Sequence, residues 1–220
     1  MLDDMLKGRH AEYLDFIRLT MVEDQVVRRG VKDARVLAAL RKVKRHLFVP
    51  AGLVSTAYDD HPLPIDCGQT ISQPYIVGLM SELLCLKGGE KVLEIGTGCG
   101  YQTAVLAELA AEVYTVEFFA GLSRQAAEKT AKLGYTNIRF KTGDGAAGWA
   151  ENGPYDAIIV TCAPATVPPA LTAQLKPGGR LAIPLGPEPQ ELKLFTKTAA
   201  GLDERNVCAV RFVPMLRAKD

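Results

Sequence analysis

The 220-residue sequence predicts an α/β protein: a mostly parallel sheet with helices on both faces, one antiparallel hairpin at the sheet edge, and a helical extension before the sheet. Three observations support this fold class. Strand-like apolar runs alternate with helical patterns between residues 91 and 185, at the spacing of βαβ units. Two later runs, 191–198 and 207–214, alternate apolar and polar residues around Ala199-Ala200-Gly201, as in a hairpin. Residues 12–43 instead repeat apolar side chains near helical spacing.

Length and composition narrow the class of protein. The length fits a single domain, 1–220, in which residues 1–80 form a helical and loop-containing extension and residues 81–220 form the core. A net charge of +1 gives no reason to expect nucleic acid or an anionic membrane as partner. Five scattered cysteines without a C-x-x-C pair argue against a disulfide framework or a zinc site. With no membrane-length apolar run and no signal-peptide core, we expect a cytoplasmic protein.

The extension is expected to contain two packing helices and then a loop. Residues 12–29 carry apolar side chains near helical spacing, and residues 31–43 repeat the pattern. Residues 51–66 are rich in Asp and Pro and are expected to form a loop. A further helix is expected to begin near Pro74, a favoured first-turn proline, which would place Ser72 at the helix N-cap.

The elements of the core follow in chain order. Short apolar runs mark its strands, and longer amphipathic stretches mark its helices. A tight turn is expected over Leu175–Arg180, just before the last parallel strand. The predicted strands are 91–95, 113–117, 138–141, 155–161 and 180–185, and the predicted helices are 101–110, 120–133 and 167–175.

A glycine turn ends the first core strand, in the stretch KVLEIGTGCGY over Lys91–Tyr101. Its apolar run stops at Gly96, Gly98 and Gly100, so a buried strand turns sharply into a helix with its backbone bared. A ligand can lie against such a main chain, and the following helix directs free N–H groups toward it. A tight turn without a ligand fits the glycines almost as well. The spacing differs from the G-x-G-x-x-G of dinucleotide-binding proteins.

Acidic residues follow the next two strands. Glu117 closes the strand 113–117, where a carboxylate can accept hydrogen bonds from both hydroxyls of a ribose; the alternative is a solvated glutamate. Asp144, in Gly143-Asp144-Gly145, follows the third strand and is suitably placed for an adenine amino group. Because the carboxyl ends of parallel strands meet at one edge of the sheet, these residues and the glycine turn predict a nucleoside pocket.

Together these motifs resemble a known superfamily. The pattern E-x-G-x-G-x-G, followed by Glu117 and by Gly143-Asp144-Gly145, is similar to the class I S-adenosylmethionine-dependent methyltransferases and implies their Rossmann-like sheet. The segment GQTISQPY, Gly68–Tyr75, is more specific. It resembles the protein-L-isoaspartate O-methyltransferase family of repair enzymes, and the resemblance extends from about Met21 to about Met215.

The resemblance implies an enzyme that transfers the methyl group of S-adenosyl-L-methionine to the free α-carboxylate of L-isoaspartyl residues in age-damaged proteins, with D-aspartyl residues as a second candidate substrate. The products would be S-adenosyl-L-homocysteine and a methyl ester that collapses to a succinimide, without a metal. We expect a monomer. Ser72 and Thr70 would be the catalytic residues, orienting the carboxylate. The implied cofactor-binding residues are Thr70, Ile71, Ser72, Gly96, Thr97, Gly98, Cys99, Glu117, Phe118, Asp144 and Gly145.

This chemistry makes small demands on the protein. An aspartyl-type carboxylate, with a pKa near 3.9, is already ionised at neutral pH, so no general base is needed. That agrees with His10 and His46, which have no nucleophile or carboxylate at a telling spacing. Two purely structural roles compete with the functional ones. Ser72 could cap a helix, which contributes about 1 kcal/mol to stability, and Cys99 could be a small packing residue instead of a reactive thiol.

Several positions depart from the family pattern. Asp66-Cys67 stands where bacterial relatives commonly have Gly-His, and Lys44 where proline is common. Met215 replaces the usual Leu in the C-terminal segment that faces the peptide, and Arg217 and Lys219 follow it. These changes leave the cofactor site intact but affect the expected substrate entrance.

Three other functions fit the sequence less well. A small-molecule or RNA methyltransferase of the same fold would need an amine-holding motif such as Asn-Pro-Pro-Tyr after the fourth strand, where this sequence has Thr161-Cys162-Ala163-Pro164. A non-catalytic binding module is disfavoured by the intact set of Gly96, Gly98, Glu117 and Asp144. The glycine spacing and the absence of hydride-transfer residues disfavour a nicotinamide dehydrogenase.

Overall fold

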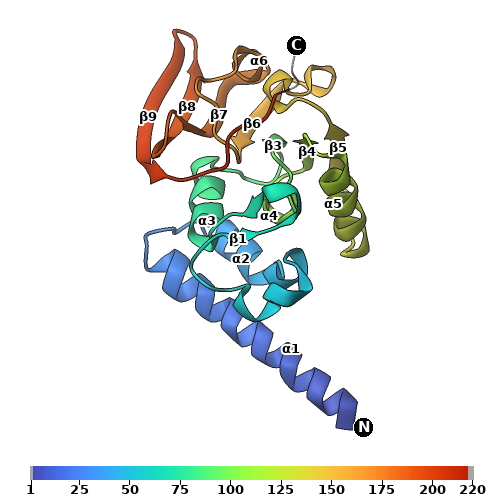
Figure 1. The fold of residues 1–220 in the computed structure, drawn as a ribbon. Helices are drawn as coiled ribbons and strands as arrows, with labels where there is room; N and C mark the ends of the chain where they lie inside the picture. Colours follow the sequence, from blue (N-terminus) through green and yellow to red (C-terminus); the bar gives the residue numbers. More distant parts are fainter. Residues whose placement is uncertain (1, 218–220) are drawn as a thin grey trace.

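The computed structural model describes residues 2–217, with side chains from Arg9 onward. A seven-stranded sheet with the order β5-β4-β3-β6-β7-β8-β9 forms its centre (Figure 1). The five strands from β5 to β7 run parallel, whereas β8 is antiparallel to both of its neighbours. The predicted fold class is therefore confirmed. The strands are β3 (Lys91–Ile95), β4 (Glu112–Glu117), β5 (Ile138–Thr142), β6 (Tyr155–Val160), β7 (Leu175–Leu185), β8 (Gln190–Thr198) and β9 (Gly201–Val210).

Alternate residues of the central strands supply two hydrophobic clusters, one on each face of the sheet. In β3, Val92 belongs to the first cluster and Leu93 to the second. Side chains of α2, α3 and α4 complete the first cluster, and Leu171 of α6 with Trp149 covers the second. Both faces are thus covered by helices, as predicted. The core helices are α3 (Pro74–Leu83), α4 (Tyr101–Leu109), α5 (Ala120–Lys132) and α6 (Pro169–Ala173).

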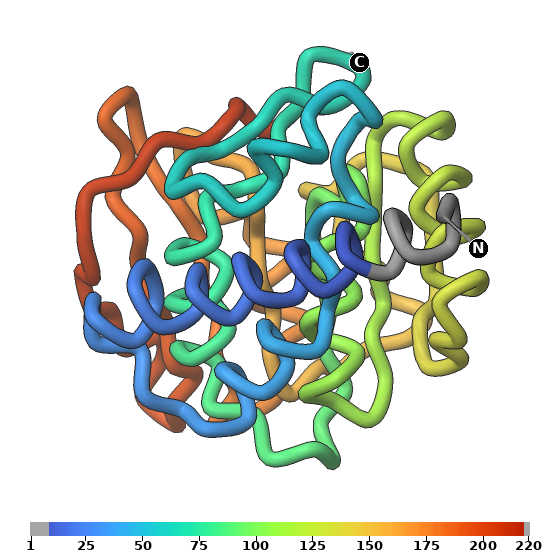
Figure 2. The backbone as a smooth tube through the Cα atoms, turned by 90° about the horizontal axis from the view of Figure 1, so that it is seen from below, coloured from blue at the N-terminus to red at the C-terminus, as the bar shows by residue number. Residues whose placement is uncertain are grey.

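The extension begins with α1 (Leu2–Met21), which continues as a π-helical segment, Val22–Val27, and leads to α2 (Ala34–Lys42). Figure 2, which views the molecule from below, shows α1 crossing in front of the helices that cover the sheet. Leu14 and Met21 of α1 belong to the same buried cluster as Val92 of the sheet. The extension and the core therefore share one hydrophobic core.

The predicted loop 51–66 contains short regular elements. A 3₁₀ turn covers Ala51–Thr56, and β1 (Leu63–Pro64) pairs antiparallel with β2 (Thr70–Ile71). Two-residue strands are too short to produce a periodic pattern, so this pairing could not be predicted from the sequence. Its consequence is functional, because β2 holds the Thr-Ile-Ser segment in an extended conformation.

Other boundaries differ from the prediction. The N-cap of α3 is Gln73, without a side-chain capping bond, so the assignment of Ser72 to the cap is wrong. Strand β9 begins at Gly201, whereas the prediction began it at residue 207. The prediction missed the first half of the strand because its residues are exposed and do not alternate between apolar and polar. Strand β7 begins at Leu175, where a turn was expected; its pairing with β6 shifts register between Tyr155 and Ala157.

Within residues 2–217, none of the helices combines the length and the apolar character that crossing a membrane requires.

Candidate functional site

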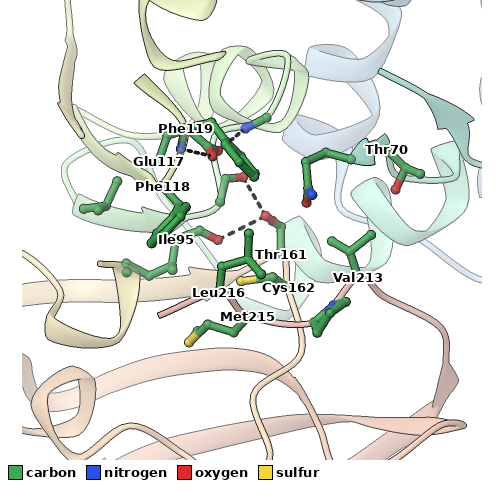
Figure 3. Close-up of a pocket in the computed structure, with 16 residues that line it drawn as sticks. Thr70, Ile95, Glu117, Phe118, Phe119, Thr161, Cys162, Val213, Met215 and Leu216 are labelled. Atoms are coloured by element: carbon green, nitrogen blue, oxygen red, sulfur yellow. Dashed lines mark hydrogen bonds between the residues drawn. The ribbon is translucent and has the colours of Figure 1, made fainter. Parts of the chain in front are cut away.

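Three adjoining hollows meet at the carboxyl edge of the parallel strands. The first, here called the strand-end pocket, lies above β3, β4 and β6 (Figure 3). The second, the turn pocket, lies beside the glycine turn, and the third is a groove of about 750 Å³ next to α3 and the end of β9. The strand-end pocket is lined by Gln69, Thr70, Ile95, Gly96, Gly98, Val116, Glu117, Phe118, Phe119, Gly145, Thr161, Cys162, Val213, Pro214, Met215 and Leu216.

The glycine turn exposes main chain to the strand-end pocket. Gly96 has a φ of +95°, and a Cβ there would lie 2.5 Å from the Thr161 hydroxyl oxygen. That hydroxyl donates to the carbonyl oxygens of Ile95 (3.0 Å) and Gly96 (2.6 Å), so it is turned onto the backbone. Both the conformation and the close contact require glycine at position 96.

Glu117 is hydrogen-bonded directly to the glycine turn and lines the same pocket. Its side chain is 5 % exposed, and its two oxygens accept hydrogen bonds from the N–H groups of Gly98 (2.8 Å) and Phe119 (3.0 Å). Each carboxylate oxygen can accept a second bond, and Glu117 lines the pocket, so one fixed side chain presents two acceptor sites to a ligand. The predicted alternative of a solvated glutamate does not fit a side chain this buried.

Asp144 and Gly145 contribute differently. Gly145 lines the strand-end pocket, and a Cβ there would lie 2.3 Å from Cγ2 of Ile95. The Asp144 carboxylate accepts the N–H of Ala146 (2.8 Å) and caps a 3₁₀ turn; it is not among the residues that line the pocket. Its contact with an adenine remains a prediction.

The Thr-Ile-Ser segment lies where the hollows meet. Thr70 lines all three, whereas Ser72 lines the groove and the turn pocket. In Figure 3, Thr70 stands across the strand-end pocket from Phe118 and Ile95. The remaining predicted cofactor residues, Ile71, Thr97 and Cys99, line the turn pocket.

Side-chain contacts brace this segment from outside. The Gln73 amide donates to both the carbonyl oxygen (3.0 Å) and the carboxylate (2.8 Å) of Asp60. Arg29 forms an ion pair with the same carboxylate and lies over the ring of Tyr75. The loop before β1 and the start of α3 are thereby tied together on either side of Ser72.

The C-terminal segment closes the strand-end pocket. Ala163 donates its N–H to the carbonyl of Val213 (2.8 Å), and Met215 donates its N–H to the carbonyl of Ala163 (2.9 Å). The Gln190 side chain pairs with both backbone groups of Phe212, at 2.9 and 3.3 Å. Met215, a departure from the family pattern, therefore lines the predicted cofactor pocket in addition to any contact with substrate.

Glu94 is a fully buried carboxyl just before the glycine turn. One of its oxygens accepts the hydroxyls of Thr103 (2.5 Å) and Thr115 (2.7 Å); within the described chain the other has no partner. Thr115 also shares a 2.6 Å hydrogen bond with Thr97 in the turn. Desolvation, opposed by the two hydroxyls and assisted by the nearby charge of Glu117, raises the pKa of Glu94 to about 8. At neutral pH Glu94 is mostly a neutral acid that links the turn to β4 and α4.

This buried acid predicts an unusual pH dependence of stability. Between the ordinary pKa of 4.5 and the folded value of about 8, the folded state retains a proton that the unfolded state has lost, so the free energy of unfolding falls as pH rises. At about 1.4 kcal/mol per unit, the limiting effect is about 5 kcal/mol. Urea unfolding measures the free energy of unfolding at several pH values between 5 and 8. This free energy should fall less steeply with pH in Glu94→Gln than in wild type, whereas the exposed control Glu128→Gln should keep the wild-type slope. Equal slopes for all three proteins would contradict the raised pKa.

The sequence reasoning missed several lining residues. Gln69 and Phe119 adjoin predicted site residues, but nothing in their type marked them. Ile95 and Val116 looked like ordinary strand residues, although a last strand residue before a glycine turn or an acid is a natural wall for such a pocket. Desolvation raises the pKa of the Cys99 thiol, which favours the packing role over a reactive thiolate.

Across the described part of the chain, no three or more His, Cys, Asp or Glu side chains are grouped so as to hold a metal ion.

Comparisons with known proteins agree with this geometry. A sequence profile of the protein-L-isoaspartate(D-aspartate) O-methyltransferase family matches residues 18–220. A protein-L-isoaspartate O-methyltransferase of Picosynechococcus sp. is 54 % identical over 199 residues, covering 90 % of each chain. A protein-L-isoaspartate O-methyltransferase 2 of Shewanella sediminis is also 54 % identical, covering 90 % of this chain and 82 % of its own.

Solved structures give the same result. One protein-L-isoaspartate O-methyltransferase superposes with a TM-score of 0.79 at 32 % identity, over 92 % of this chain, and this chain spans 65 % of that protein. A Plasmodium falciparum structure described with the same activity, in complex with S-adenosyl-L-homocysteine, shares the fold with a TM-score of 0.80 at 24 % identity, over 91 % of this chain and 99 % of its own. The resemblance seen in the sequence is confirmed, and the chain belongs to the protein-L-isoaspartate(D-aspartate) O-methyltransferase family.

Proposed function

We propose that this protein is a repair enzyme that transfers the methyl group of S-adenosyl-L-methionine to the free α-carboxylate of L-isoaspartyl residues in damaged proteins. Membership of the family supports the reaction. Among this chain's own residues, the main support is Thr70, which lines both the strand-end pocket and the groove. One hollow would hold the methyl donor and the other the damaged peptide.

The strand-end and turn pockets fit the donor. A bare backbone at Gly96 and Gly98 allows close approach of a ligand, and the fixed Glu117 carboxylate has acceptor capacity for two ribose hydroxyls. Phe118 is 39 % exposed beside Glu117 and offers an apolar surface to the rest of the nucleoside. When bound, the donor supplies an electrophilic methyl group on a positively charged sulfur.

Thr70 and Ser72 would orient the acceptor. Both residues lie at the junction of the hollows, and a hydroxyl can donate a hydrogen bond to a carboxylate without transferring a proton to it. Because the acceptor is already ionised near neutral pH, the protein has only to align it and exclude water. The neutral donors suit this task, since a hydroxyl reduces the nucleophilicity of a carboxylate less than a full positive charge does.

A small-molecule or RNA methyltransferase of the same fold would need an amine-holding motif after the fourth strand, β6, and the residues there do not support it. Thr161 turns its hydroxyl onto the backbone of the glycine turn, and Ala163 pairs with the C-terminal segment. Neither is available to hold a substrate amine. A non-catalytic module remains distinguishable by experiment.

Labelled methyl transfer tests the proposal. An isoaspartyl peptide incubated with methyl-labelled S-adenosyl-L-methionine should acquire a base-labile methyl ester, and its normal aspartyl twin should stay unlabelled. Equal labelling of the twins would contradict isoaspartyl recognition. Donor binding with no labelling of either peptide would favour the non-catalytic module.

The ester would collapse to a succinimide without help from the enzyme, and D-aspartyl peptides are a second substrate to assay. We further propose a cytoplasmic monomer that acts on proteins and not on nucleic acid or membranes. The net charge of +1 and five free cysteines support this setting.

A further inference from the structure

The lining of the groove carries charge at one place only. Among its described lining residues, ten are uncharged, and the remaining two are Glu188 and Arg211. Close by, Asp60 is already paired with Arg29, so this neighbour adds no net charge. Any charge that a bound peptide meets along the groove wall is therefore that of Glu188 or Arg211.

The backbone holds these two residues facing each other. Glu188 lies in the turn between β7 and β8, and Arg211 directly follows β9. The neighbouring residues are joined through the Gln190 side chain, which bonds both backbone groups of Phe212. Arg211 Nε forms an ion pair with Glu188 Oε1. The side chains are 80 % and 55 % exposed, so the pair is solvated and contributes little to stability. A charge on a bound peptide can therefore compete for either partner.

The position of the pair excludes a role at the reacting carboxylate. Glu188 and Arg211 line the groove but neither of the other two hollows, whereas Thr70 lines all three. Reaction requires the acceptor to reach the junction marked by Thr70. The pair instead faces residues that flank the acceptor along the peptide.

We propose that Glu188 and Arg211 form a charge-balanced rim that lets the enzyme accept either charge on residues flanking the isoaspartyl residue. This rests on the proposed function and adds a determinant of substrate breadth. With both residues present, attraction of a flanking charge by one is offset by repulsion from the other, so the enzyme accepts acidic and basic surroundings alike. Removal of one residue exposes the charge of its partner.

The test uses sets of isoaspartyl peptides in which a single flanking residue is Glu, Gln or Lys. One set is made for each flanking position, from three residues before to three residues after the isoaspartyl residue. Wild type should discriminate less than about threefold between the Glu and Lys peptides in kcat/KM. At some flanking position Arg211→Gln should favour Lys, and Glu188→Gln should favour Glu, each by about fivefold, the size expected for one exposed ion pair. The change should fall on KM and fade at high salt.

Matched controls separate the rim from net charge. Arg205→Gln and Asp203→Asn make the same charge changes on exposed residues of β9 that do not line the groove, and should leave the Glu-to-Lys ratio as in wild type. An unchanged ratio in both rim variants at every position would overturn the proposal. If the wild-type enzyme did not methylate the Gln peptide, the result would instead count against the proposed function. Fluorescence anisotropy with the same peptides measures the charge preference independently of turnover, and an identical preference in wild type and rim variants would again overturn the rim.

Discussion

Replacing Ser72 with alanine is expected to lower kcat about 100-fold, the lower end of the loss seen when one preorganised donor is removed from a reaction centre. Ser72 lines the groove and the turn pocket, and its hydroxyl would align the acceptor carboxylate. Affinity for S-adenosyl-L-methionine, measured by calorimetry, should change little. Single-turnover methylation of an isoaspartyl peptide gives the rate.

Folding is not expected to account for that loss. The α3 helix takes its N-cap at Gln73 without a side-chain bond, so Ser72→Ala removes no cap and should leave the melting temperature nearly unchanged. Ser55→Ala, at an exposed position of the same extension, serves as the control and should retain full activity. Wild-type turnover in Ser72→Ala would leave the serine without a catalytic role.

Replacing Glu117 with alanine is expected to weaken binding of S-adenosyl-L-methionine about 100-fold or more. Two charge-assisted hydrogen bonds to ribose, at about 1.5–3 kcal/mol each, account for a loss of this size. The same substitution releases the N–H groups of Gly98 and Phe119, which loosens the glycine turn itself. Isothermal titration with S-adenosyl-L-homocysteine measures the change without turnover.

The matched control lies on the same strand. Glu112 begins β4 and Glu117 ends it, so Glu112→Ala makes the same substitution at the opposite end of the strand. We expect wild-type affinity for that variant. Equal affinities for Glu112→Ala and Glu117→Ala would remove the ribose assignment.

Local patterns were enough to find the core of the fold. The strand β3 was predicted with the bounds that the structure has, because a buried apolar run ends abruptly in glycines. The N-terminal half of β9 escaped prediction because its exposed residues, such as Asp203 and Arg205, carry no inside–outside alternation. The β1–β2 pairing escaped because each strand is only two residues long, although Leu63 pairs with Ile71 and Pro64 with Thr70.

The site divides in the same way. The position of Glu117 in the pocket wall was predictable because the end of a parallel strand fixes where its side chain lies, whereas its contact with a ribose stays a prediction. The closure of the pocket by Met215 depends on a pairing between Ala163 and the distant C-terminal segment, which no local pattern encodes. The cap assigned to Ser72 was wrong although α3 begins at Pro74 as expected: with the proline in the first helical position, the N-cap is the residue directly before it, Gln73, and Ser72 lies one residue outside the helix.

The central claim is that one edge of the sheet holds the methyl donor with its sulfur turned toward the Thr70–Ser72 segment. A crystal structure of the protein with S-adenosyl-L-homocysteine tests it most directly. We predict both ribose hydroxyls within hydrogen-bonding distance of the Glu117 carboxylate, and the sulfur beside Thr70 where the strand-end pocket opens into the groove. A ligand bound outside this pocket, or a sulfur facing away from residues 70–72, would contradict the account.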